Sequence, residues 1–138
     1  MKALVKWESG INFKGKAATG VWVPIGPSKP EVGEPQAATP MELLLMALGA
    51  CTAMDMVHIL GKKKIAFDDF WVELEADKTE GHPKVFSAIR MKFIIVGKDV
   101  PRKAVVEAEK LSHEKYCSVG AMIGKVASIT REVEVREK

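Results

Sequence analysis

The sequence feature that most constrains this chain is one long apolar helix predicted over residues 39–61. Thr39 and Glu42 mark its start because together they form a capping box, and Pro40 suits the first helical turn. Beyond that turn, leucine, methionine and alanine occupy nearly every side of the helix. We expect Gly61 to end the helix in a left-handed conformation.

A helix that is apolar on most sides must be surrounded by protein on most sides. The chain has 138 residues, which suits a single domain over 1–138 with one core. A single sheet from such a chain covers only one side of the helix. We therefore infer that a second subunit covers the rest, so that the expected assembly is a homodimer.

Alternating apolar and polar residues predict strands both before and after this helix. The predicted strands cover residues 3–7, 11–17, 20–26, 67–78, 84–97 and 128–137. The fourth and fifth strands form a hairpin, and a loop rich in proline and glycine occupies 26–38. Two shorter helices are expected over 100–113, capped by Asp99, and over 116–126. This order of strands and helices defines an α+β fold.

Charge and hydropathy argue against a nucleic-acid or membrane partner. The net charge is only +3, and the lysines are scattered apart from Lys62–Lys64, which close the long helix where cations are favourable. The apolar run from Leu43 to Met54 is shorter than the ~20 residues of a membrane span, and the N-terminus alternates like a strand rather than a signal peptide. We expect a soluble cytoplasmic protein. Abundant lysine and glutamate, with one asparagine and one glutamine, indicate a thermophilic source.

Cys51 and Cys117 are the only cysteines, and their wide separation excludes a CxxC site. Cys51 lies among small residues of the long helix, and Asp55 and His58 share its face on a helical wheel. One interpretation is an inert core thiol, because free cysteine is often buried, with Asp55 and His58 as a polar helix end. The other is a polar stripe that leads into a small cavity around a reactive thiol.

Cys117 lies near the start of a short predicted helix, two residues after Lys115. Exposed amide groups and a nearby cation both favour a thiolate. Two such thiols suit peroxide chemistry, because one becomes a sulfenic acid and the second condenses with it to a disulfide. An external dithiol must then reduce that disulfide.

Two other interpretations of the cysteines remain. His58 and His113 would complete a Cys2His2 metal site, but Cys51 and His58 lie about two helical turns, roughly 10 Å, apart, which disfavours a shared ion. A structural disulfide is also conceivable, since hyperthermophilic proteins use disulfides inside the cell.

Two segments resemble a known family. "TPMELLLMALGACTAMDMV" (39–57) and "LSHEKYCSVGAMI" (111–123) are similar to the OsmC/Ohr superfamily of osmotically inducible and organic-hydroperoxide-resistance proteins, and within it to the YhfA-like branch. The resemblance implies an intertwined homodimer with two long central helices between antiparallel-rich sheets. It implies antioxidant, thiol-dependent reduction of organic hydroperoxides by a dithiol or lipoyl-type reductant, without metal or other cofactor. By position, Cys51 matches the attacking cysteine and Cys117 the resolving one.

The chain departs from the family pattern at two positions. The family uses an arginine from the N-terminal strands, but the first arginine here is Arg90, so Lys14 or Lys16 would have to supply that charge. The family's glutamate position holds Met41, which leaves Glu42, one residue on, as a candidate catalytic residue. These departures keep open an alternative function, a small-ligand-binding or redox-sensing protein without efficient peroxidase turnover.

Overall fold

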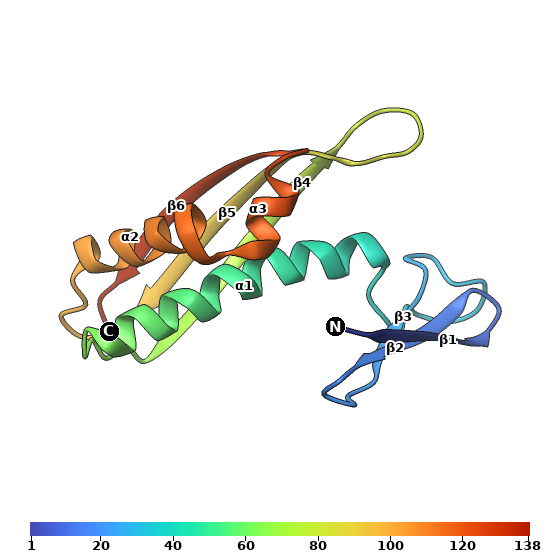
Figure 1. Ribbon diagram of the computed structural model, residues 1–138, viewed down its shortest axis with the longest axis horizontal. Helices are drawn as coiled ribbons and strands as arrows, with labels where there is room; N and C mark the ends of the chain where they lie inside the picture. The colour runs from blue at the N-terminus through green and yellow to red at the C-terminus, as the bar shows by residue number, and fades with distance from the viewer. The chain divides into compact units, whose positions relative to one another are not determined.

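The computed structural model describes residues 1–138, which divide into two compact units. The N-terminal unit comprises residues 1–44 and the C-terminal unit comprises residues 45–138. Helix α1 (Pro40–Lys62) begins in the first unit and runs for most of its length through the second (Figure 1). The predicted long helix is therefore confirmed.

The two ends of α1 differ in how well the sequence predicted them. The capping box is confirmed, because the Thr39 N–H donates to the Glu42 carboxylate at 3.4 Å and the Glu42 N–H donates to the Thr39 hydroxyl at 3.2 Å. The end predicted at Gly61 is wrong, because the left-handed residue is Lys64, with φ of 57°. The N–H of Ile65 donates to the Leu60 carbonyl, which closes a Schellman motif around a lysine instead of the usual glycine.

The N-terminal unit is a three-stranded antiparallel sheet in the order β1-β2-β3. Its strands are β1 (Ala3–Ser9), β2 (Asn12–Ala17) and β3 (Val23–Ile25). Strand β3 is shorter than predicted, and Pro24 lies within it at the sheet edge, where a missing N–H is tolerated. The loop predicted over 26–38 is confirmed, with one isolated bridge between Ile25 and Ala38.

This N-terminal sheet has almost no core of its own. Gly26 is the only buried residue among residues 1–44. Large apolar side chains remain exposed instead: Leu4, Val5, Trp7, Ile11, Phe13, Val21, Trp22, Val23 and Val32. An apolar hollow of about 750 Å³ is lined by side chains that include Val5, Phe13, Ile25, Leu43 and Leu44. A three-stranded sheet normally needs a packed apolar face for stability, and this one lacks it.

The C-terminal unit is built on a sheet in the order β4-β5-β6. Its strands are β4 (Asp69–Lys78), β5 (Phe86–Val96) and β6 (Ser128–Arg136). The predicted hairpin is confirmed as antiparallel β4 and β5, while β6 runs parallel to β5. Helices α1, α2 (Arg102–Leu111) and α3 (Ser118–Ile123) lie on one face of this sheet (Figure 1). Between sheet and helices lies the core: Leu48, Met56, Leu60, Ile89, Met91, Phe93, Ile95, Val105, Ala108 and Val133.

The start of α2 corrects one prediction. Asp99 does not cap this helix, because the N-cap residue is Pro101 and no side chain bonds there. Proline has no N–H of its own and favours an extended residue before it, so the helix begins only after Pro101. Asp99 instead adopts a φ of 52°, and its N–H donates to the Glu137 carboxylate.

The segment after α2 is also different from the predicted helix over 116–126. A π-helical turn, η1 (Ser112–Tyr116), follows α2 directly. Cys117 then leaves helical geometry, with φ of −72° and ψ of 95°, and becomes the N-cap of the short helix α3. This turn places Cys117 between two helical segments.

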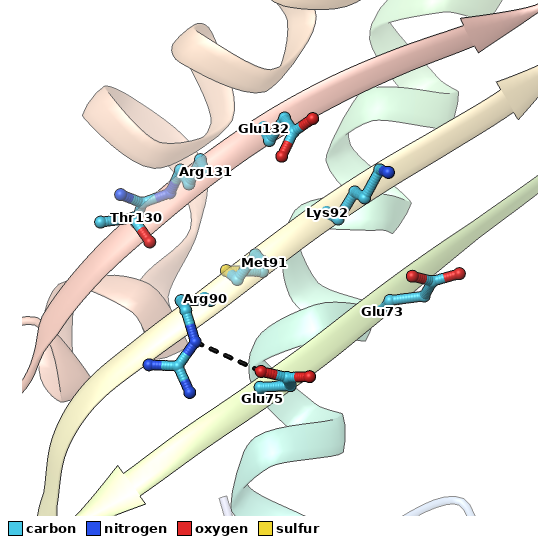
Figure 2. A pocket seen from close by; sticks show the side chains of 8 residues that line it. All are labelled: Glu73, Glu75, Arg90, Met91, Lys92, Thr130, Arg131 and Glu132. Atoms are coloured by element: carbon cyan, nitrogen blue, oxygen red, sulfur yellow. Dashed lines mark hydrogen bonds and ion pairs between the residues drawn. The ribbon is translucent and has the colours of Figure 1, made fainter.

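The face of the C-terminal sheet that the helices leave uncovered is polar. Figure 2 shows charged side chains from neighbouring strands around a hollow of about 440 Å³ on this sheet. Arg90 bonds Glu75 at 3.3 Å and Asp77 at 2.9 Å, and Lys92 bonds Glu134 at 2.6 Å. Because charges of both signs pair with one another, we interpret this face as a solvated surface rather than a binding site.

Helix α1 is long and apolar enough to cross a membrane by length and composition alone. The apolar run from Leu43 to Met54 predicts that the segment is too short for a span. The helix itself is longer, because it includes residues on both sides of that run. One such helix is weak evidence, because the core helix of a soluble protein has the same character. Leu48, Met56 and Leu60 on one side of α1 are fully buried in the core, as in a core helix.

Candidate functional site

The structure brings the two cysteines together although they are far apart in the sequence. Cys51 lies on α1 and is half-buried, whereas Cys117 at the start of α3 is only 3% exposed. Both thiols are free, and the Cys117 side chain lies within hydrogen-bonding reach of the Cys51 thiol. This neighbourhood of two thiols lies entirely within the C-terminal unit.

A glycine lies near each cysteine at a position with little room for a side chain. A β-carbon on Gly49 of α1 would lie 2.7 Å from Leu74 Cδ1 of β4, so a larger residue there would require the Leu74 side chain to shift. A β-carbon on Gly120 of α3 would lie 3.1 Å from the Cys117 sulfur. Small residues therefore set the spacing around the thiol pair.

The Cys117 sulfur receives two hydrogen bonds in a buried environment. The Thr52 hydroxyl, next to Cys51 on α1, donates to it at 3.4 Å. The Gly120 N–H donates to it at 3.3 Å. Through the first of these bonds, Thr52 links α1 directly to the N-cap residue of α3.

Cys51 has a less favourable environment for a thiolate. Burial raises the pKa of the Cys51 thiol above its ordinary value, and the Val119 backbone N–H opposes this effect. Contact with Cys117 and the negative charge of Asp55 raise that pKa further. Cys51 therefore stays protonated to a higher pH than an ordinary thiol, and no cationic side chain contributes to its pKa shift.

Asp55 and His58 line one cavity, as a polar stripe on α1 predicts, but Cys51 is not part of its lining. The cavity has a volume of about 450 Å³ and is lined by Asp55, His58, Ile59, Lys62, Lys63, Leu111 and Tyr116. The Ser112 hydroxyl donates to the Asp55 carboxylate at 2.7 Å. The polar partner of Asp55 is thus a side chain of η1, not only solvent.

His113 has a partner other than a metal. Its Nδ1 lies 2.7 Å from Glu109 Oε1, and Arg131 Nε lies 3.3 Å from the same oxygen. Glu109 is buried, and the three side chains form a polar cluster between α2, η1 and β6. No three His, Cys, Asp or Glu side chains in the chain are placed to hold a metal ion.

The other candidate residues lie in the N-terminal unit. The Glu42 carboxylate accepts a hydrogen bond from the Thr39 N–H, which accounts for its capping role. Lys14 bonds Glu8 at 2.7 Å, and the Lys14 and Lys16 ammonium groups each lie 4.7 Å from the Trp22 ring centroid. A catalytic role for these three residues stays a prediction.

Sequence reasoning missed the polar groups that surround the thiols. Thr52 and Ser112 have no distinguishing pattern, because a hydroxyl in an apolar helix more often bonds its own backbone. Arg131 meets Glu109 only through tertiary packing. The four-residue spacing of Glu109 and His113 was the one signal available, since such pairs share a helix face.

Comparison with known proteins gives a match to one protein family and to a relative along the whole chain. Residues 33–132 match the family model described as "OsmC-like protein". The chain is 39% identical over 135 residues to Protein YhfA of Escherichia coli K12, with 98% of each chain covered.

Solved structures agree with this match. A hypothetical protein from Aquifex aeolicus VF5 is 34% identical, with a TM-score of 0.87 over 99% of this chain and 96% of that chain. The organic hydroperoxide resistance protein OhrB of Bacillus subtilis shares the fold, with a TM-score of 0.68 at 17% identity over 97% and 98% of the two chains.

Proposed function

We propose that this chain, which belongs to the OsmC-like protein family, is a thiol-dependent peroxidase that reduces organic hydroperoxides. Cys51 is the attacking thiol and Cys117 the resolving one. The observation that carries this proposal is the pair of free thiols at the contact of α1 and α3. The name of the Bacillus subtilis protein that shares the fold, an organic hydroperoxide resistance protein, supports the substrate class.

One cycle of hydroperoxide reduction requires the two protein thiols and one external dithiol. The Cys51 thiolate attacks the terminal oxygen of the hydroperoxide, the O–O bond breaks, and the alkoxide takes a proton to leave as an alcohol. The Cys117 thiolate then attacks the sulfenic sulfur of Cys51, and hydroxide leaves as water after protonation. A dithiol or lipoyl-type reductant returns the disulfide to two thiols, so the cycle needs no metal or other cofactor.

The exposed apolar surface supports a homodimer as the working form. On α1, Met46, Met54 and Val57 remain exposed, with Met54 at 72%. The N-terminal sheet also lacks a covered apolar face. A second copy of the chain would cover both surfaces, since large exposed apolar patches mark interfaces. It would also supply Glu42, Lys14 or Lys16 as candidates for activating Cys51. We expect the protein to be soluble and cytoplasmic.

Hydroperoxide turnover tests the proposal directly. Cumene hydroperoxide and lipoamide or dithiothreitol should support many turnovers by the wild type. Cys51→Ser should lose the activity, and Cys117→Ser should stop after sulfenic acid formation. Met122→Ser is the matched control, because it removes an exposed sulfur-containing side chain outside the site. Hydroperoxide consumption no faster than that of Cys51→Ser would reject the proposal.

One observation favours a second candidate, a redox sensor or small-ligand-binding protein. The pKa of Cys51 is raised, chiefly by burial, and no cation offsets this effect. A protonated thiol reacts slowly with peroxide, because the thiolate is the nucleophile. This candidate predicts a single slow oxidation to the Cys51–Cys117 disulfide without sustained turnover.

A further inference from the structure

Ser112 joins the two parts of the chain that carry the cysteines. Its hydroxyl donates to Asp55, which lies one helical turn after Cys51 on α1. Its backbone carbonyl accepts the N–H of Cys117 at 2.8 Å. Ser112 is completely buried, whereas Asp55 is partly buried at the edge of the cavity described above. One residue is therefore bonded both to the helix of Cys51 and to the backbone of Cys117.

The π-helical turn explains why this connection exists. The N–H of Cys117 bonds the carbonyl five residues back, rather than four as in an α-helix. The wider turn ends at Cys117, whose backbone is extended and which forms the N-cap of α3. Single π turns in proteins often occur at functional sites, and two side-chain hydrogen bonds join this segment to α1, from Ser112 to Asp55 and from Thr52 to the Cys117 sulfur.

We propose that Ser112 and Asp55 are positioning residues whose hydrogen bond holds Cys117 opposite Cys51 for disulfide formation. Its role in peroxide reduction rests on the proposed function. The same hydrogen bond would favour the Cys51–Cys117 disulfide whichever oxidant forms it. When the bond is intact, Ser112 ties the backbone N–H of Cys117 to α1, and the Thr52 hydroxyl separately ties the Cys117 sulfur to the same helix. The Cys117 thiolate then needs little backbone movement to reach the sulfenic sulfur of Cys51.

Asp55 has a second effect that opposes the first. Its carboxylate contributes to the raised pKa of Cys51, after burial and the contact with Cys117. Asp55 therefore favours the geometry of closure while disfavouring the attacking thiolate. Asp55→Asn separates the two effects, because the amide oxygen still accepts from Ser112 while the charge is removed.

The test measures disulfide formation without peroxide. The wild type is equilibrated with oxidised and reduced dithiothreitol, and the fraction of Cys51–Cys117 disulfide is measured by mass spectrometry. For half of the protein to form the disulfide, Ser112→Ala should require a ratio of oxidised to reduced dithiothreitol about tenfold higher than the wild type. This is the effect of losing one charge-assisted hydrogen bond. Asp55→Asn should need a smaller change, and it should move the pH midpoint of Cys51 alkylation to lower pH.

Controls keep the outcome decisive. Ser87→Ala removes an exposed hydroxyl from β5 and should behave as wild type. If Ser112→Ala does not fold, Asp55→Ala removes the same hydrogen bond from a helical position that tolerates alanine. A wild-type redox equilibrium in Ser112→Ala, or in Asp55→Ala as its substitute, overturns the inference. An equal loss in Ser112→Ala and Asp55→Asn also overturns it. A wild type that closes its disulfide normally but does not reduce hydroperoxide rejects the proposed function alone.

Discussion

The two units of this chain differ in what their strands are packed against. The sheet of the C-terminal unit is covered on one face by three helices, and Phe93, Ile89 and Ile95 are fully buried there. The sheet of the N-terminal unit has similar apolar residues, yet Val5 and Trp7 of β1 are each 60% exposed. Apolar side chains stabilise a sheet only when something covers them. The N-terminal sheet has no such cover within its own unit, and this difference is the observation behind the proposed homodimer.

The thiol pair lies in the unit that has its own core. Its geometry is therefore set within one chain, by contacts between α1, η1 and α3. The candidate activating residues Glu42, Lys14 and Lys16 lie in the other unit. The thiol pair therefore does not depend on the N-terminal unit for its placement, whereas the proposed activating residues all belong to that unit.

The largest expected effect comes from placing a charge on the uncovered sheet. Val5→Asp should abolish the proposed homodimer, because a carboxylate buried in its interface without a partner costs several kcal/mol. Analytical ultracentrifugation measures the result. Val32→Asp is the control, since Val32 is 89% exposed in the loop and outside the sheet. A dimer that tolerates Val5→Asp as well as Val32→Asp would show that this sheet is not the covered surface.

Truncation of a phenylalanine in each unit gives the next largest effect. Phe93→Ala should destabilise the protein by about 3–5 kcal/mol, because Phe93 is completely buried. Phe13→Ala should cost a similar amount only if a second copy covers the N-terminal sheet. Urea unfolding at several protein concentrations measures both. A small loss for Phe13→Ala, independent of concentration, would mean that this face stays in water.

The pH dependence of Cys51 tests whether the N-terminal unit acts on the thiol. Burial raises the pKa of Cys51, so its alkylation by iodoacetamide should be slow at pH 7 and still rising about tenfold per unit at pH 8. The measurement is the rate of modification of Cys51 by mass spectrometry. A faster rate in the wild-type dimer than in Val5→Asp would show that assembly supplies charge. A plateau reached by pH 7 would contradict the raised pKa.

The smallest expected effect concerns the exposed face of the C-terminal sheet. Hydrogen bonds from Arg136 and Lys92 lower the pKa of Glu134 to about 2. A lowered pKa means that this carboxylate stabilises the fold above about pH 4.5 and loses that effect as the pH falls toward 2. Glu134→Gln should flatten the fall of the urea midpoint in this range. Glu31→Gln, an exposed loop carboxylate, should leave the slope as in the wild type.

The sequence predicted the elements whose signals are local. The capping box at Thr39 and Glu42 depends on residues three apart, and the alternation in β4 and β5 depends on neighbours two apart. The ends assigned to Gly61 and Asp99 were wrong because glycine and aspartate only favour those roles. Lys64 accepts the left-handed conformation where the chain must turn, and Pro101 moves the start of α2.

The sequence by itself determined the long apolar helix, the α+β order and the presence of two thiols to be explained. Only the tertiary structure decided that Cys51 and Cys117 meet, and that Thr52 and Ser112 surround them. The physical reason is range. Caps and strands arise from residues within a few positions, whereas the hydrogen bond from Ser112 to Asp55 joins positions 57 residues apart and exists only once α1 and η1 have packed.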